Sequence, residues 1–221
     1  MDELQPEQQL QKTDAKKKVA LVIGAGDATG GEIAKRFARG GYIACMTRRN
    51  AEKLQPLIEE IEAEGGLAYG FASDARKEDQ VIALVEEIEA NIGEINVLVF
   101  NIGANVPCSI LEETARKYFK IWEMACFGAF LTGREVAKRM VVREHGSIIF
   151  TGATAGIRGA ANFAAFAGAK HALRALAQSM ARELGPKNIH VAHVVVDGAI
   201  VPILLKTLFL KCTRAKNRMA Y

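Results

Sequence analysis

The sequence has few of the residues that build metal sites and disulfide frameworks. Its 221 residues include only four cysteines and four histidines. No two cysteines form a C-x-x-C pair, which argues against a structural zinc site and against paired disulfides. We therefore expect that the protein binds no metal and that its thiols are reduced, as in a cytoplasmic protein. The cysteines are Cys45, Cys108, Cys126 and Cys212.

Long apolar runs are also missing. No run approaches the roughly 18 apolar residues that a transmembrane helix requires. Residues 1–17 are mostly polar and lack the apolar stretch of a secretory signal. We expect this segment to be a flexible polar arm, and we expect no membrane association.

Acidic residues are absent from the end of the chain. The net charge is +4, but no acid follows Asp197, while the preceding body is close to neutral. A basic end can contact nucleic acid or a membrane surface, yet it is more often simply solvated. We therefore expect neither partner. The basic residues of this end are Lys206, Lys211, Arg214, Lys216 and Arg218.

Short apolar runs do recur, and amphipathic stretches separate them. Half of the residues are apolar, which is enough for one core. Strands without polar alternation, separated by helices, predict a parallel sheet covered on both faces. We predict one Rossmann-type, doubly wound α/β domain over 18–200, without a clear seventh strand, and an atypical basic tail over 201–221. The predicted strands are 18–24, 42–46, 67–71, 95–100, 147–152 and 189–196, and the main predicted helices are 51–66, 81–93, 112–143 and 162–184.

A glycine-rich turn follows the first predicted strand. The stretch GAGDATGG places Gly24, Gly26, Thr29 and Gly30 between that strand and a helix. Glycines there allow a tight turn and let backbone N–H groups approach a pyrophosphate at the helix N-terminus. The turn predicts dinucleotide binding, with a purely structural turn as the alternative.

The end of the second predicted strand indicates which dinucleotide is bound. A site selective for NAD usually has an acid about 20 residues after the first glycine, but here CMTRRN is followed by no acid before Glu52. The guanidinium groups of Arg48 and Arg49 suit a 2′-phosphate, which favours NADP(H). Asp27 brings an opposing charge to the turn. The alternative is that both arginines only begin a solvated helix.

These segments together resemble the short-chain dehydrogenase/reductase family from about residue 18 to residue 198. The glycine turn is similar to the family's T-G-x-x-x-G-x-G, with Ile23 and Ala28 as departures. The resemblance implies that Asp74, in FASDA, contacts the adenine. VFNIGA is similar to the family's N-N-A-G segment and retains Asn101 and Gly103, which we expect at the cofactor. After residue 198 the resemblance fails, which indicates an unrelated ending such as that of a splice or frame variant.

The segment FAGAKHA resembles the family's Tyr-x-x-x-Lys motif, but without the tyrosine. In the family, the lysine holds the nicotinamide ribose and lowers the pKa of a tyrosine that protonates the substrate carbonyl. A serine orients the substrate, and an asparagine supports a proton-relay water. Here Lys170 matches the lysine, whereas Phe166, Ala153 and Ala125 stand at the other three positions. Lys170 is therefore the one catalytic residue, and a further cofactor contact, that the resemblance implies.

Other groups near this motif could supply the missing proton. Lys170 itself could donate if a bound cofactor and apolar neighbours lowered its pKa. Thr154 carries a hydroxyl next to the serine position, but a hydroxyl is a poor donor without activation. His171 points about 100° away from Lys170 around a helix, so we expect it to pack or to be solvated.

Two functions remain open at this point. The first is an NADP(H)-dependent oxidoreductase of unusual chemistry, acting on a small carbonyl or alcohol. The second is a catalytically inactive nucleotide-binding scaffold or regulatory protein, which the three departures at the catalytic positions favour. The resemblance also implies a homo-oligomer, because two long helices often form a dimer face in this family.

Overall fold

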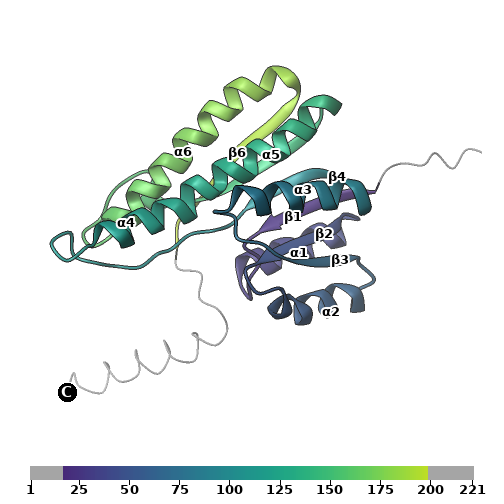
Figure 1. The fold of residues 1–221 in the computed structure, drawn as a ribbon, viewed down its shortest axis with the longest axis horizontal. Coiled ribbons are helices and arrows are strands. Elements are labelled where there is room, and N and C mark those ends of the chain that lie inside the picture. Colours follow the sequence, from purple (N-terminus) through teal and green to yellow (C-terminus); the bar gives the residue numbers. More distant parts are fainter. Residues whose placement is uncertain (1–16, 199–221) are drawn as a thin grey trace, which may run out of the picture.

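A single parallel sheet of six strands forms the centre of the computed structural model, which describes residues 17–198 (Figure 1). The strand order is β3-β2-β1-β4-β5-β6. The predicted Rossmann-type α/β fold is confirmed, and each predicted strand is present within one or two residues. The strands are β1 (Lys18–Ile23), β2 (Ile43–Arg48), β3 (Ala68–Ala72), β4 (Glu94–Phe100), β5 (Gly146–Ala153) and β6 (Ile189–Val196).

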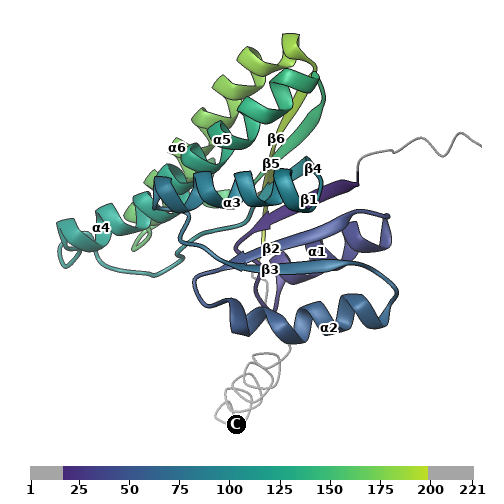
Figure 2. The same cartoon turned by 45° about the vertical axis from the view of Figure 1, so that its right-hand side comes forward.

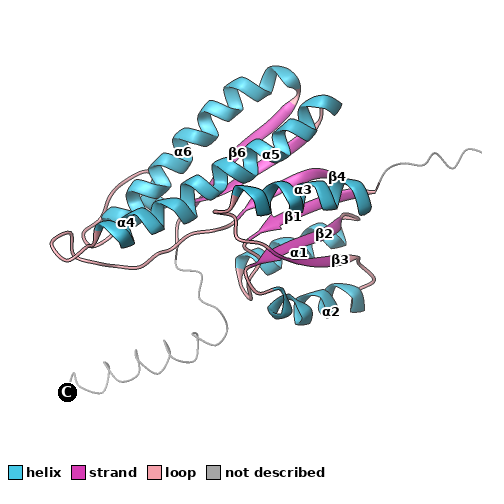
Figure 3. Ribbon diagram, viewed as in Figure 1, coloured by secondary structure: helices cyan, strands magenta, loops and turns pink. Residues whose placement is uncertain are grey.

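Helices cover the sheet from two sides (Figures 2 and 3). Two helices lie against one face, and three longer helices lie against the other. The first group is α1 (Thr29–Arg39) and α2 (Gln55–Ala63), and the second is α3 (Glu78–Asn91), α5 (Gly128–Arg143) and α6 (Ala164–Leu184). The predicted helix over 112–143 is divided into α4 (Ala115–Trp122), the π-helical turn η2 (Glu123–Phe127) and α5. Short 3-10 turns are η1 (Ala51–Leu54), η3 (Thr154–Gly156) and η4 (Gly185–Lys187).

The central strand explains why the apolar runs do not alternate with polar residues. In β1, Leu21 and Ile23 pack into the core beneath α3, α5 and α6, whereas Ala20 and Val22 pack against α1 and α2. All four side chains are at most 2% exposed. Burying a large aliphatic side chain stabilises the fold by roughly 1.5–3 kcal/mol. Both faces of the strand therefore contribute to stability.

The chain reverses its direction of winding at β1. Its two neighbours are β2 on one side and β4 on the other, so the crossovers leave β1 toward opposite edges of the sheet. In open α/β sheets, ligands bind at the carboxyl ends of the strands beside such a switch point. The predicted site residues other than Lys170 lie at or just after the carboxyl ends of β1, β2, β3 and β4, and Lys170 lies in α6, which follows β5.

Two predicted segments lie outside the described residues. These are nearly all of the N-terminal arm over 1–17 and the tail over 201–221. The predicted lack of a clear seventh strand concerns the same tail, so it also lies outside the described residues. Between residues 17 and 198, no helix combines the length and the apolar character that a membrane span requires.

Candidate functional site

The glycine turn after β1 is held tightly against the end of β2. The backbone N–H groups of Gly24 and Ala25 both donate to the carbonyl oxygen of Thr47, at 3.2 Å. Gly24 has φ +85°, and an added Cβ would lie 2.8 Å from Ile102 Cγ1 and 2.9 Å from the Asn101 oxygen. Only glycine meets both the left-handed backbone and the lack of space.

The first turn of α1 approaches the same strand end. A Cβ on Gly30 would lie 2.4 Å from the carbonyl oxygen of Gly24, and Asn101 Nδ2 donates to that oxygen at 3.3 Å. Gly26 differs, because, apart from Gly26 and its two neighbours in the chain, no heavy atom of the described residues lies within 4 Å of its added Cβ. Its open side and the adjacent start of α1 form a cradle suited to an anion. The structure therefore brings Gly24, Gly26, Gly30 and Asn101 together.

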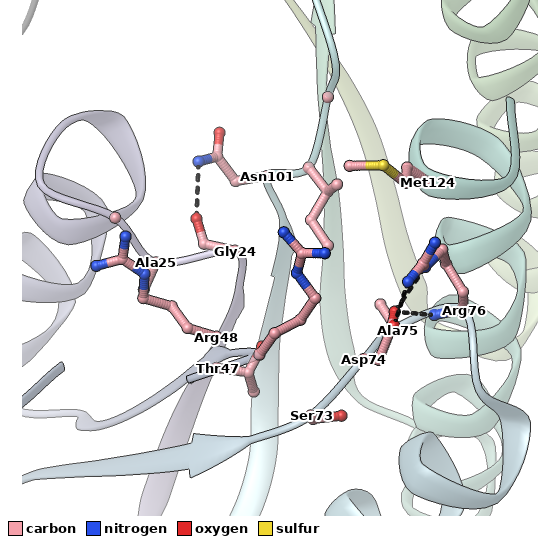
Figure 4. A pocket seen from close by; sticks show the side chains of 14 residues that line it. Gly24, Ala25, Thr47, Arg48, Ser73, Asp74, Ala75, Arg76, Asn101 and Met124 are labelled. Carbon is pink, nitrogen blue, oxygen red and sulfur yellow. Dashed lines mark hydrogen bonds and ion pairs between the residues drawn. The ribbon is translucent and has the colours of Figure 1, made fainter. Parts of the chain in front are cut away.

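A cleft of about 360 Å³ opens in front of this turn (Figure 4). In that view, Gly24, Ala25 and Arg48 lie on one side, and Asp74, Arg76 and Met124 lie on the other. Arg49 also lines the cleft. Both predicted 2′-phosphate ligands are thus at the cleft. Arg48 already has partners, because its Nη1 lies 3.1 Å from Asp27 Oδ1 and donates to the Lys53 oxygen at 3.3 Å.

Asp74 lies in the cleft wall, but its carboxylate is directed at Arg76. Arg76 donates to it from Nε at 2.8 Å and from the backbone N at 3.2 Å, with Nη2 at 2.5 Å from the other oxygen. The side-chain hydrogen bonds from Arg76 lower the pKa of Asp74. Arg76 also reaches Glu123 of η2, at 3.4 Å. Sequence reasoning missed Arg76, although its place two residues after Asp74 was a usable signal. The adenine contact of Asp74 stays a prediction.

Lys170 lies at the bottom of a neighbouring cavity of about 390 Å³, which Thr29, Gly103 and Phe166 also line. The lysine is only 4% exposed. Its Nζ donates to the carbonyl oxygens of Thr151 at 2.7 Å and Ile102 at 3.2 Å. Burial lowers its pKa from 10.5 to about 8. The ammonium group is therefore held at one place by backbone acceptors but is poorly solvated.

Replacing Lys170 with Met should change how stability depends on pH. Because the pKa falls from 10.5 in the unfolded chain to about 8 in the fold, the unfolded chain binds more protons between these values. The free energy of unfolding of the wild type should therefore rise with pH across this window, relative to the variant. Melting temperatures of both proteins at pH about 7 and about 10 measure this. If the melting temperatures of the wild type and the variant differ by the same amount at both pH values, burial does not lower the pKa of Lys170.

Two of the three departures from the family's catalytic set, Ala125 and Phe166, are buried. Ala125, in η2, is fully buried in a small apolar cluster with Ala165 and Ala169 of α6. The ring centroid of Phe166 lies 5.9 Å from Lys170 Nζ, and Ala153 ends β5 in the wall of the same cavity. Apolar side chains thus stand at these three positions in place of hydroxyl and amide groups.

A second cavity, of about 270 Å³, adjoins that of Lys170. Ala153, Phe166 and Val196 line both cavities, and Thr154 lines only the second. The Thr154 hydroxyl donates to Asp197 Oδ1 at 2.5 Å. Sequence reasoning missed this pair, because Asp197 is distant in the chain and lies just after the last strand. His171, by contrast, is tied to its own helix, with Nδ1 2.9 Å from the Ala167 oxygen.

The sheet order and the glycine cradle at its switch point define a dinucleotide-binding α/β protein. A family model described as short chain dehydrogenase matches residues 18–207, so the chain belongs to the short-chain dehydrogenase/reductase family of oxidoreductases. The match extends past residue 198, where the resemblance was expected to fail. Members of this family bind a nicotinamide dinucleotide, typically act on small molecules and typically oligomerise.

Individual relatives cover most of the chain. The 2-dehydro-3-deoxy-D-gluconate 5-dehydrogenase of Formosa agariphila is 32% identical over 179 residues, which are 80% of this chain and 68% of the relative. A solved short-chain dehydrogenase from Rhodopseudomonas palustris is 50% identical, with a TM-score of 0.77, and the match covers 88% of this chain and 90% of that one. A solved NAD⁺-bound xylitol dehydrogenase is 28% identical, with a TM-score of 0.78, over 81% and 70% of the two chains.

Proposed function

We propose that the protein is an NADP(H)-dependent oxidoreductase acting on a small carbonyl or alcohol. One observation carries the proposal: the glycine cradle and Lys170 open onto adjoining cavities that share Asn101, Ile102 and Gly103. A dinucleotide is an extended molecule with a pyrophosphate at its middle. The two cavities adjoin at these shared residues, as an extended ligand requires.

The residues present fit a nicotinamide dinucleotide. Gly24 and Gly30 have no room for a Cβ, so glycine at these positions lets the backbone segments approach closely. The open side of Gly26 is left for the pyrophosphate. Two carbonyl oxygens fix the position of Lys170 Nζ, which supports the proposal that it would hold the ribose hydroxyls at the nicotinamide end. When bound, the dinucleotide supplies the hydride donor or acceptor.

The preference for the 2′-phosphate rests on Arg48, with Arg49 beside it. Asp27 competes for Arg48 in the structure, so a phosphate has to displace a carboxylate. The Asp27 side chain is 87% exposed, and exposed ion pairs are weak. Removing the Asp27 carboxylate should therefore tighten NADPH binding, and only modestly.

Asp27→Asn is expected to tighten NADPH binding by about 2- to 5-fold. The substitution keeps the size of the side chain and frees Arg48 for the phosphate. NADH lacks the phosphate, so its affinity should change little and serves as the internal control. Fluorescence titration of both nucleotides measures the effect. A parallel change in both affinities would argue that Arg48 does not contact the 2′-phosphate.

The second candidate is a nucleotide-binding scaffold without activity. The apolar packing of Phe166, Ala153 and Ala125 favours it, because each replaces a polar catalytic group. Oxidation of NADPH in the presence of a panel of small ketones, aldehydes and quinones separates the two. Turnover that Lys170→Met abolishes supports the enzyme. Saturable NADPH binding without any turnover supports the scaffold.

Location and assembly complete the proposal. Free thiols at Cys45, Cys108 and Cys126 are compatible with a cytoplasmic protein. The groove between α5 and α6 exposes apolar side chains that include Phe130, which supports pairing with a second copy along these helices. A monomer in sedimentation experiments at micromolar concentration would contradict the homo-oligomer.

A further inference from the structure

The fold brings a hydroxyl and a carboxylate together beside the cavity of Lys170. β5 and β6 are paired in parallel with Ala153 opposite Val196. The residues that follow each strand therefore meet at the carboxyl edge of the sheet, and these are Thr154 and Asp197. Thr154 occupies the position after the one that matches the family's serine.

The contact between them is short and charge-assisted. The distance from Thr154 Oγ1 to Asp197 Oδ1 is 2.5 Å, which falls in the range of about 2.5–2.7 Å for a hydroxyl bound to a carboxylate. A threonine hydroxyl alone is a poor acid or base, but a hydrogen-bonded base activates it. Asp197 is exposed, so it can exchange a proton with water.

We propose that Thr154 and Asp197 form a proton relay that replaces the missing tyrosine. The proposal rests on the oxidoreductase function proposed above. Thr154 is the catalytic residue, because it lines the cavity next to Phe166 and can touch the substrate. Asp197 is a positioning residue that acts through Thr154. Lys170 keeps its role at the cofactor, since backbone carbonyls already hold its Nζ.

In alcohol oxidation, the relay moves one proton in two linked transfers. The substrate O–H bond breaks, and its proton goes to Thr154 Oγ1 as the threonine's own proton passes to Asp197 Oδ1. The hydride that leaves the substrate carbon would be taken up by the oxidised nicotinamide dinucleotide when bound, so that the carbonyl double bond forms as the O–H proton leaves. Asp197 then releases its proton to water. Carbonyl reduction is the reverse and needs a protonated Asp197.

The first test compares three variants of the full chain in the oxidation of 2-butanol, cyclohexanol, 1-phenylethanol and 3-hydroxybutyrate with NADP⁺. Thr154→Val keeps the shape and removes the hydroxyl, and Asp197→Asn keeps the shape and removes the charge. Both should lower kcat by about 100-fold or more. Thr154→Ser restores the hydroxyl and should stay within about 10-fold of the wild type, because the relay is intact.

Nucleotide titration of the same variants separates this inference from the proposed function. A wild type that binds neither NADPH nor NADH ends the proposed function. A wild type that binds NADPH but oxidises none of the four alcohols counts against the relay and favours the scaffold. Turnover that is unchanged in Thr154→Val overturns the relay alone. Unchanged NADPH affinity in the slow variants supports it, because the loss then lies in chemistry.

The second readout needs neither cofactor nor turnover. In the protein without nucleotide, the NMR signal of the Thr154 methyl group should move with pH as the bound carboxylate titrates, and Asp197→Asn should remove this response. Lys170 lines the adjoining cavity and His193 lies on β6, so their titration is the background that the Asn variant controls. Arg158 lines the same cavity as Thr154, and its fixed positive charge is common to both proteins. A methyl signal that ignores pH in the wild type, or that responds equally in the variant, overturns the relay.

Discussion

Gly30→Ala is expected to weaken NADPH binding by about 5- to 150-fold and to lower the melting temperature. The added Cβ would lie 2.4 Å from the carbonyl oxygen of Gly24 and 2.8 Å from Ala25 Cα. Backbone atoms cannot rotate away, so α1 has to shift from the end of β1. Overpacking of this kind costs roughly 1–3 kcal/mol. If NADPH binding has to reverse the shift of α1, the same free energy is lost from binding, and this corresponds to about 5- to 150-fold in affinity.

Gly26→Ala is the matched control for this prediction. Apart from Gly26 and its two neighbours in the chain, no heavy atom among residues 17–198 lies within 4 Å of the added Cβ, so the melting temperature should stay the same. NADPH binding should still weaken, because the methyl group would occupy the open side of the cradle. Calorimetry and fluorescence titration of both variants measure the two effects separately. Equal melting temperatures for the two variants would contradict the crowding at Gly30.

Phe166→Tyr is expected to raise the rate of ketone reduction by about 100-fold or more, the usual contribution of a general acid. The Phe166 ring lies at the edge of both substrate-side cavities, and its centroid is 5.9 Å from Lys170 Nζ. A hydroxyl on this ring would have a cation nearby, which favours its ionised form and lowers its pKa. The variant would thus regain the acid that the family uses.

Two comparisons make the Phe166 prediction specific. Phe166→Leu changes the ring without adding a proton donor and should give no gain. If Thr154 and Asp197 relay the proton in the wild type, the gain from Phe166→Tyr should be largest in the Thr154→Val background, because the two routes then substitute for each other. A Tyr variant that binds NADPH normally but reduces ketones no faster would contradict the proposed site.

Much of the fold, and the position of the glycine turn within it, could be predicted from the sequence. The apolar run over 18–24 predicted a strand, and β1 (Lys18–Ile23) is buried at every residue after Lys18, as is typical of an uninterrupted apolar run in a parallel sheet. Gly24 and Gly30 were identifiable because glycine is required where backbones come close. These features depend on local pattern, which the sequence displays directly.

The side-chain pairs of the site could not be predicted in this way. The contact of Thr154 with Asp197 depends on the register of β5 against β6, which no local pattern specifies. The hydrogen bonds between Asp74 and Arg76 depend on side-chain direction in a loop. The burial of Ala125 against α6 depends on the π-helical turn η2. Each is a tertiary result that only the folded chain shows.

The most direct test of the account is a fluorescence titration of NADPH and NADH with the wild type and Arg48→Ala. We expect saturable binding, a preference for NADPH, and a loss of that preference in the variant, because Arg48 lines the cleft beside the glycine turn. Binding of neither nucleotide to the wild type would contradict the central claim that this cleft holds NADP(H).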